Sequence, residues 1–192
     1  MISEGATNRQ IIESYPTYFT KIDKIEKARQ TLLEDEGKST WRDIETTYLF
    51  GETGTGKTRS VMDKYGYPNV FRVTNYDHPF DNYQGQDVII FEEYRSSLPI
   101  SELLNYLDGY PCELPCRYSN KFANYTKVFI ISNIPLEQQY RNIQNDQPAT
   151  WKALKRRIDH IIERRHVTDE PFCEGEEVVQ IEIQDDNIRE RT

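Results

Sequence analysis

The stretch that decides the fold of this chain is Gly51-Glu52-Thr53-Gly54-Thr55-Gly56-Lys57-Thr58. It fits the pattern G-x-x-x-x-G-K-[ST] at every fixed position. The glycines allow a tight turn whose backbone N–H groups point inward at phosphates, and the start of a following helix adds partial positive charge. Lys57 is expected to reach the β- and γ-phosphates of ATP, and the Thr58 hydroxyl is the expected Mg²⁺ ligand. The stretch therefore predicts a nucleotide-binding loop.

The residues on either side of this loop support the prediction. Residues 46–50 are β-branched or aromatic and predict a short strand that leads into the loop. Residues 57–64 predict the helix that leaves it. A chance turn rich in Gly and Thr is the alternative, and the strand–loop–helix context argues against it.

The composition describes one folded domain with room for a small appendage. The chain has 192 residues, of which 29% are charged and 12% aromatic. A formal net charge of −8 argues against a general binder of polyanions, so a nucleic-acid partner would require locally concentrated basic residues. No apolar run approaches the length of a membrane span. Cys112, Cys116 and Cys173 lack the spacing of a disulfide framework or a zinc site and are expected to be reduced thiols.

A second element predicted to carry chemistry is the strand over residues 88–91, which is followed by two carboxylates. Four consecutive apolar residues predict a strand buried on both faces, as in a parallel sheet. Open α/β sheets place their chemistry at the carboxyl ends of such strands. Glu92 is expected at the Mg²⁺ ion, directly or through water, and Glu93 is expected to orient the attacking water or act as its base. The alternative is that both residues merely end an exposed strand.

A basic hairpin is predicted over residues 110–123. Arg117, Lys121 and Lys127 are expected near its tip, interleaved with aromatic residues. That mixture suits phosphate contacts combined with base stacking, and a solvated turn is an equally weighted alternative.

Two further polar sites follow along the chain. The predicted strand over residues 127–132 ends at Asn133, which could sense a γ-phosphate or a water molecule, or could simply form a turn. Residues 142–150 are expected to form a polar loop, and residues 151–158 a helix that carries Arg156 and Arg157. Strands are expected over residues 160–163 and 179–183.

The first forty residues predict a helical arm. Asn8 could cap a short first helix, and the apolar spacing over residues 17–33 predicts an amphipathic second helix. Residues 34–40 are polar and are expected to form a linker, so the nucleotide domain should begin near Trp41. The apolar stripe of the second helix could pack on its own domain or on a neighbouring subunit, and both alternatives stay open.

Taken together, these pieces resemble the superfamily 3 helicase domain of Rep replication initiators, which small circular single-stranded DNA viruses and related rolling-circle plasmids encode. The order of phosphate loop, acidic strand, basic hairpin and Asn-terminated strand within a compact stretch carries the resemblance. It implies an α/β fold: a P-loop, AAA+-like domain with a central, mainly parallel five-stranded sheet, preceded by a small helical oligomerisation segment.

The resemblance also implies a role for each motif. Lys57 and Thr58 correspond to Walker A, Glu92 and Glu93 to Walker B, the segment near Lys121 to the pore-lining B′ loop, Asn133 to the motif C sensor, and Arg156 or Arg157 to an arginine finger. The finger would complete the ATP site of the neighbouring subunit, and the sequence does not decide between the two arginines. The implied cofactors are ATP and Mg²⁺. The implied assembly is a homo-oligomer, a hexamer, that moves 3′→5′ on single-stranded DNA without any membrane association.

The expected organisation has three parts. Residues 1–40 form the oligomerisation segment and linker, residues 41–165 the ATPase domain, and residues 166–192 a carboxyl-terminal strand and tail. Rep proteins also carry a nicking endonuclease with a His-hydrophobe-His motif, and no H-x-H occurs in this sequence. The chain is therefore expected to be an excised helicase part or a relative without a nickase. The expected location is the cytoplasm for a bacterial plasmid and the host nucleus for a eukaryotic virus.

Three alternatives remain open. An RNA helicase of the same superfamily would respond to RNA rather than DNA. A P-loop kinase for a small acceptor would need a lid with several arginines and no basic hairpin. A module that binds nucleotide without hydrolysing it would not need both carboxylates, which are intact here.

Overall fold

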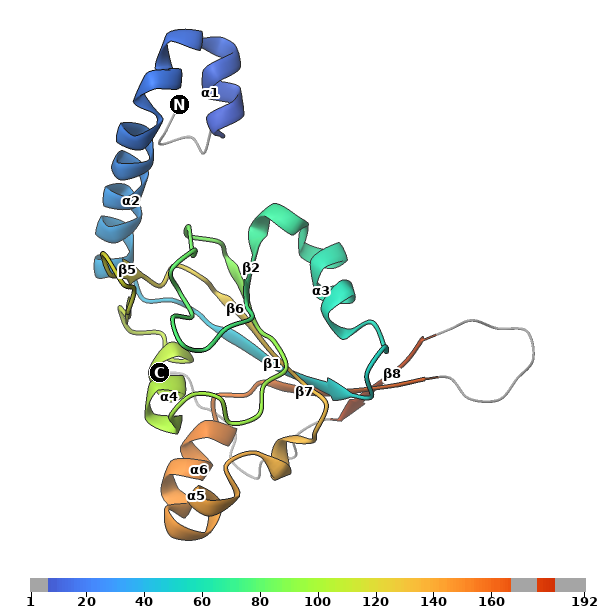
Figure 1. Cartoon of the computed structure of the whole chain (residues 1–192). Coiled ribbons are helices and arrows are strands. Elements are labelled where there is room, and N and C mark those ends of the chain that lie inside the picture. The colour runs from blue at the N-terminus through green and yellow to red at the C-terminus, as the bar shows by residue number, and fades with distance from the viewer. Residues whose placement is uncertain (1–6, 167–175, 182–192) are drawn as a thin grey trace, which may run out of the picture.

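A central sheet organises the computed structural model, which describes residues 7–166 and 176–181 (Figure 1). The strands are β1 (Glu45–Gly51), β2 (Val70–Val73), β3 (Val88–Phe91), β6 (Lys127–Ser132), β7 (His160–His166) and β8 (Glu176–Ile181). Their order across the sheet is β2-β3-β6-β1-β7-β8, and the first five run parallel while β8 pairs antiparallel with β7. The predicted α/β fold with a mainly parallel five-stranded core is confirmed, and β8 extends it by one strand.

Burial on both faces explains why these segments form parallel strands. All four residues of β3 are buried, as are six of the seven residues of β1. Burying one large apolar side chain contributes about 1.5–3 kcal/mol, so a central strand of this kind is held mainly by its packing. Helix α3 (Lys57–Tyr65) packs on one face through Val61, and α4 (Ile100–Tyr106) packs on the other through Leu103.

The segment expected to be a polar loop over residues 142–150 is instead helical. It contains α5 (Arg141–Asp146) and the start of α6 (Pro148–Lys155), and η4 (Leu136–Gln138) precedes them. Pro148 suits the first position of a helix, and Leu154 is buried in the main core. The prediction was wrong because helices this short place few apolar residues inward, which leaves their sequence polar overall.

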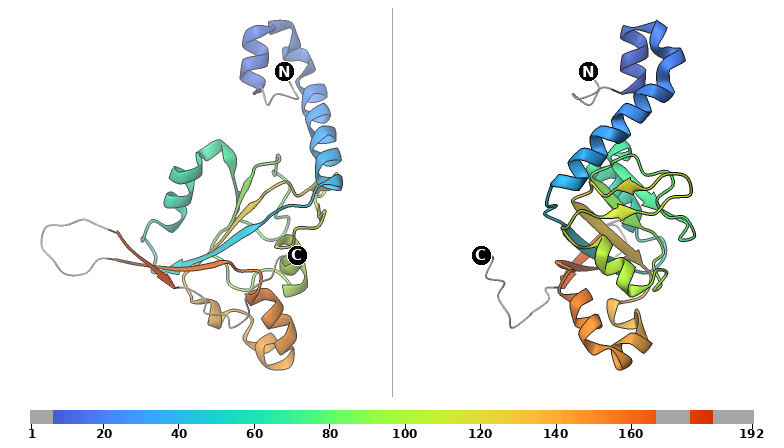
Figure 2. Two further views of the ribbon diagram at one scale, coloured as in Figure 1. Left: turned by 180° about the vertical axis from the view of Figure 1, so that it is seen from behind. Right: turned by 90° about the vertical axis from the view of Figure 1, so that its left-hand side faces the viewer.

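The amino-terminal arm is built of helices, with a break at Tyr15 between the first and the second. It consists of α1 (Asn8–Ser14), the 3₁₀ helix η2 (Pro16–Lys21) and α2 (Ile22–Ser39). Thr7 rather than Asn8 caps α1, because its hydroxyl accepts from the backbone N–H of Gln10 in a capping box. Figures 1 and 2 show the arm rising away from the sheet with α1 at its far end.

The linker expected over residues 34–40 is not present, because α2 continues to Ser39. The last turns of α2 pack against the base of a hairpin formed by β4 (Glu113–Leu114) and β5 (Lys121–Phe122). At Gly37 an added Cβ would lie 2.6 Å from the Cβ of Phe122, so the close approach requires glycine there. Tertiary contact therefore keeps a polar, glycine-containing stretch helical.

The far part of the arm leaves several large apolar side chains exposed. These are Tyr15, Tyr18, Phe19 and Leu32. The end of α2 packs on the domain at β5, and the alternative that the apolar stripe packs on a neighbouring subunit stays a prediction. None of the described helices is long and apolar enough to cross a membrane.

Candidate nucleotide-binding site

The loop after β1 has the backbone geometry that phosphate binding requires. Gly56 adopts a left-handed conformation, with φ of 69°, directly before α3. Gly51 has φ of 143°, and a Cβ there would lie 1.9 Å from the carbonyl oxygen of Arg164 on β7. Glycine alone adopts these conformations without strain, so sterics require glycine at both positions.

Lys57 is the most enclosed charged residue of the loop. It is 6% exposed, and its Nζ donates to the carbonyls of Gly51 and Glu52 at 2.8 and 2.7 Å and to Asn133 Oδ1 at 3.1 Å. Burial lowers the pKa of Lys57, and the nearby carboxylate of Glu93 opposes that shift. The ammonium is thus held between the loop and the end of β6.

Thr58 and Glu92 form the second part of the site. The Thr58 hydroxyl donates to Glu92 Oε2 at 2.8 Å. Hydroxyl and carboxylate oxygens are the donors that Mg²⁺ prefers, and that ion usually takes one or two protein carboxylates while phosphates and water fill its other positions. Thr58 and Glu92 supply one hydroxyl and one carboxylate, which fits this pattern. The described residues contain no group of three or more His, Cys, Asp or Glu side chains that could hold a metal.

Glu93 and Asn133 close the cluster. Asn133 Nδ2 donates to Glu93 Oε2 at 2.7 Å, and its Oδ1 accepts from Lys57. Glu93 has φ of 48°, an unusual conformation for a residue with a side chain. Such strain recurs at functional sites, where the surrounding structure holds the residue in place. The structure therefore brings the predicted residues Lys57, Thr58, Glu92, Glu93 and Asn133 together from the ends of three strands.

The two predicted arginines lie at the opposite edge of the sheet. They lie in a turn after α6, which ends at Lys155, rather than in the helix as predicted. Shortly after this turn β7 begins at His160, which pairs with Thr47 near the start of β1. Arg157 is half-buried and donates to Asp108 Oδ2 at 2.6 Å and to the carbonyl of Ala153 at 3.1 Å. Arg156 is exposed beside it, and both line a pocket of about 550 Å³. Neither arginine reaches the phosphate loop of its own chain.

The predicted basic residues of the hairpin are not gathered at one tip. Arg117 is exposed near the tip and pairs with Asp81 at 2.9 Å. Lys121 points back into the domain and donates to the carbonyls of Asp81 and Tyr83 at 2.6 and 2.7 Å. Lys127 lies at the start of β6, 3.3 Å from Glu45, because the hairpin has already ended by that point. Tyr118 at the tip is 98% exposed.

Comparison with known proteins agrees with this geometry. Residues 47–134 match the family described as RNA helicase. The chain is similar to the replication-associated protein of goose circovirus, with 27% identity over 82% of this chain and 51% of that protein. It is also similar to those of pigeon circovirus (29% identity; 69% of this chain, 41% of that protein) and beak and feather disease virus (28%; 54% and 35%).

These matches support a superfamily 3 helicase domain of the Rep type in this chain. The stretch matched to the helicase family contains the phosphate loop, both carboxylates and Asn133. The chain spans about half or less of the length of the relatives named above.

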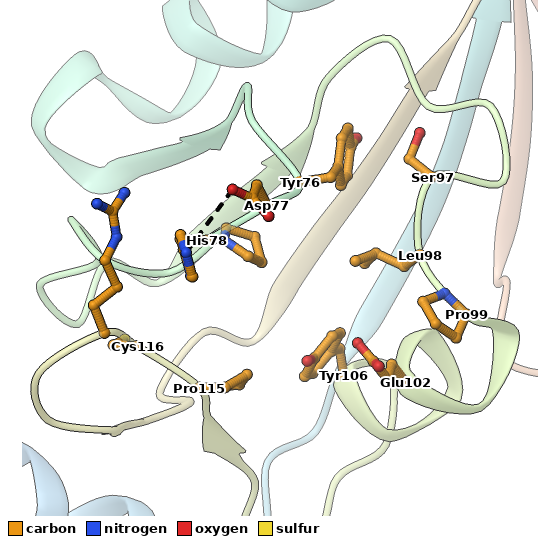
Figure 3. Close-up of a pocket in the computed structure, with 12 residues that line it drawn as sticks. Tyr76, Asp77, His78, Ser97, Leu98, Pro99, Glu102, Tyr106, Pro115 and Cys116 are labelled. Atoms are coloured by element: carbon orange, nitrogen blue, oxygen red, sulfur yellow. Dashed lines mark ion pairs between the residues drawn. The ribbon is translucent and has the colours of Figure 1, made fainter.

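A pocket of about 440 Å³ lies beside the hairpin of this Rep-type domain (Figure 3). The segments that line it include residues 76–79, residues 97–99 and hairpin residues 115–117. Tyr76 joins this pocket to the nucleotide site, because its hydroxyl donates to the carbonyl of Glu92 at 2.7 Å.

Three residues of the site were not predicted from the sequence: Arg72, Tyr76 and Arg164. Arg72 Nε contacts Glu92 Oε1 at 2.7 Å, and Arg164 Nη1 lies 3.5 Å from the carbonyl of Thr55 in the phosphate loop. Arg72 left one signal in the sequence, since it is the single charged residue among the four of β2. No sequence pattern indicates Tyr76 or Arg164, because only the tertiary fold brings them to the site.

Proposed function

We propose that this chain is the ATP-hydrolysing DNA helicase domain of a rolling-circle replication initiator. The observation that supports this most is the hydrogen-bonded cluster at the carboxyl edge of the sheet. Lys57, Thr58, Glu92, Glu93 and Asn133 meet there from the ends of β1, β3 and β6, and phosphoryl transfer uses side chains of these kinds.

Each residue of the cluster then has a distinct role. Lys57 would turn from the loop carbonyls to the β- and γ-phosphates of ATP. Thr58 and Glu92 would hold Mg²⁺, which neutralises charge on the phosphates when it is bound. Glu93, held by the Asn133 amide, would orient the water that attacks the γ-phosphate, and Asn133 would sense that phosphate through its contact with Lys57.

The arginine that completes the site would come from a neighbouring subunit. We assign this role to Arg156, because it is the more exposed of the two candidates. Arg157 would instead brace α6, since its guanidinium is held by Asp108 and by the carbonyl of Ala153. The assembly would be a ring, with residues 1–40 as the oligomerisation arm, residues 41–165 as the motor and residues 166–192 as the tail.

Single-stranded DNA would thread past the hairpins, with movement 3′→5′. Arg117 and Tyr118 supply a charge and an exposed ring at the tip, and Lys121 would hold the hairpin in position or turn outward to a phosphate. Lys127, at the base, would add to the local positive charge. A domain of this kind would act in the host nucleus for a eukaryotic virus, or in the cytoplasm for a bacterial plasmid.

The second candidate is an RNA-directed helicase, and the description of the matching family as RNA helicase favours it. Against it, the similar proteins are named replication-associated proteins of circoviruses. Comparing how strongly single-stranded DNA and RNA stimulate ATP hydrolysis separates the two candidates.

The experiment that tests the proposal measures ATP hydrolysis and particle mass with and without Mg²⁺ and single-stranded DNA. Wild-type protein should hydrolyse ATP, form rings and respond more strongly to DNA than to RNA. Lys57→Ala should abolish turnover, whereas Lys64→Ala, an exposed lysine near the other end of α3, should not. Normal turnover by Lys57→Ala would contradict the site, and a stronger response to RNA would favour the second candidate.

A further inference from the structure

The edge strand β2 and the residues after it frame Glu92. The Glu92 backbone N–H donates to the carbonyl of Val73 at 3.0 Å, and its carbonyl accepts from the Tyr76 hydroxyl at 2.7 Å. Arg72 Nε donates to Glu92 Oε1 at 2.7 Å. A five-residue segment thus holds both the backbone and the side chain of this carboxylate.

The two carboxylate oxygens of Glu92 have different partners. Oε2 accepts from the Thr58 hydroxyl and faces the phosphate loop, whereas Oε1 accepts from Arg72 and faces the sheet edge. The terminal torsion of a glutamate is broad, so a carboxylate held on one side only could rotate and exchange its oxygens. Contact on both sides selects one orientation.

The contact between Arg72 and Glu92 matters because the Glu92 carboxylate is buried. The side chain of Glu92 is 9% exposed, while that of Arg72 is 45% exposed. A carboxylate largely removed from water needs a partner to remain ionised at low cost, and removing the partner of a buried charge is more disruptive than removing a surface pair. An arginine suits the position, because its planar guanidinium has directional donors that a lysine ammonium lacks.

We propose that Arg72 is a positioning residue for the metal site, which acts by fixing Glu92 so that Oε2 faces Thr58. The inference rests on the proposed function, because it assumes that Thr58 and Glu92 hold Mg²⁺ there. Partners that orient a metal ligand typically change metal affinity or activity by about 10–100-fold when they are lost. Arg72 would therefore govern how much Mg²⁺ the nucleotide complex requires.

The test measures binding of a fluorescent ADP analogue, which does not depend on turnover. Titrations are made in EDTA and over a series of Mg²⁺ concentrations, with Arg72→Gln, Arg72→Lys and wild-type protein. The matched control is Arg165→Gln, which removes an arginine whose Nη2 lies 2.6 Å from Glu163 Oε2 on β7 and whose side chain is 63% exposed. Binding in EDTA should be the same for all four proteins.

The half-saturating Mg²⁺ concentration should rise by about 10–100-fold in Arg72→Gln and by less in Arg72→Lys, while Arg165→Gln should match the wild type. In a Glu92→Gln background, Arg72→Gln should add no further change, because the residue acts through Glu92. A Mg²⁺ requirement equal to that of the wild type in Arg72→Gln would overturn the proposal.

Equal losses of binding in EDTA and in Mg²⁺ by both Arg72 variants would also overturn it, since they would show a structural role only. If the wild-type protein shows no Mg²⁺-dependent nucleotide binding, the proposed function fails together with this inference. If the wild type shows Mg²⁺-dependent binding and Arg72→Gln has the same Mg²⁺ requirement, only the inference about Arg72 fails.

Discussion

Charged side chains are buried at the carboxyl edge of the central sheet and partly exposed at its amino edge. At the carboxyl edge, Lys57 and Glu92 are 6% and 8% exposed, and they contact other members of the nucleotide site. At the amino edge, the side chains of Glu45, Lys127 and His160 are 34–50% exposed and form simple ion pairs. Desolvated charges interact strongly and respond to ligands, whereas solvated pairs contribute little. The comparison separates a buried, hydrogen-bonded site from a solvated edge of the sheet.

The largest effect is expected from removing Arg156, which lies at the amino edge and is proposed to reach the nucleotide site at the carboxyl edge of a neighbouring subunit. Arg156→Ala should lower ATP turnover by about 10³–10⁵-fold, because a finger supplied from a neighbour stabilises the charge of the transition state. Mixing it with Lys57→Ala protein should restore part of the activity, since one interface then combines an intact loop with an intact arginine. Turnover at several protein concentrations measures both effects.

The matched control for this experiment is Arg157→Ala. It should lower thermal stability, because it removes the contact with Asp108, and its turnover should fall less than that of Arg156→Ala. Rescue that depends on Arg157 rather than Arg156 would reverse the assignment. Turnover that is independent of concentration, with no rescue in any mixture, would favour a self-contained ATPase or kinase.

Within the carboxyl edge, Glu93→Gln should lower turnover by about 10²–10⁴-fold, the usual contribution of a positioned base. The amide can still accept from Asn133, so nucleotide binding should persist. Rapid-quench hydrolysis and equilibrium binding separate the two quantities. Glu137→Gln, an exposed residue of η4, serves as the control, and turnover that is unchanged in Glu93→Gln would remove this residue from the mechanism.

The hairpin at the amino edge should show smaller effects that depend on salt. Tyr118→Ala should weaken single-stranded DNA binding by about 1–3 kcal/mol through lost stacking. Arg117→Ala should reduce the slope of log affinity against log salt by about 0.7, the value for one phosphate contact on a single strand. Tyr67→Ala, another exposed tyrosine, should change neither quantity. DNA affinities that stay constant in both hairpin variants would identify the hairpin as a surface turn.

The smallest effect concerns the ion pair of Lys127 with Glu45. Partial burial raises the pKa of Glu45, but Lys127 and His160 more than offset this, and the net pKa lies below its ordinary value of 4.5. A lowered carboxyl pKa stabilises the fold above pH 4.5, and this contribution is lost as the pH falls through the folded-state pKa. Because the pair is half-exposed, Lys127→Ala should cost only about 0.2–1 kcal/mol at neutral pH.

Urea unfolding at neutral pH and at acid pH measures this contribution. The difference between Lys127→Ala and the wild type should shrink on acidification. A difference that grows toward acid pH would show that the pair does not control the titration of Glu45.

Local pattern was enough to predict the elements that depend on neighbours in sequence. The phosphate loop, the buried strand before Glu92 and the strand ending at Asn133 follow from spacing and apolar runs, since such patterns act within a few residues. The same reasoning failed for residues 34–40 and 142–150, where packing on Phe122 and around Leu154 holds polar stretches in helices.

Only the tertiary structure decided which side chains meet. Pairing of β2 with β3 places Arg72 against Glu92. Packing of the hairpin on residues 81–83 turns Lys121 toward the carbonyls of Asp81 and Tyr83, and Lys127 instead begins β6. These contacts join residues 20 to 40 positions apart in the chain. No local pattern encodes them, because parallel strands such as β2 and β3 are paired through a long crossover and the hairpin packs on a loop distant in sequence.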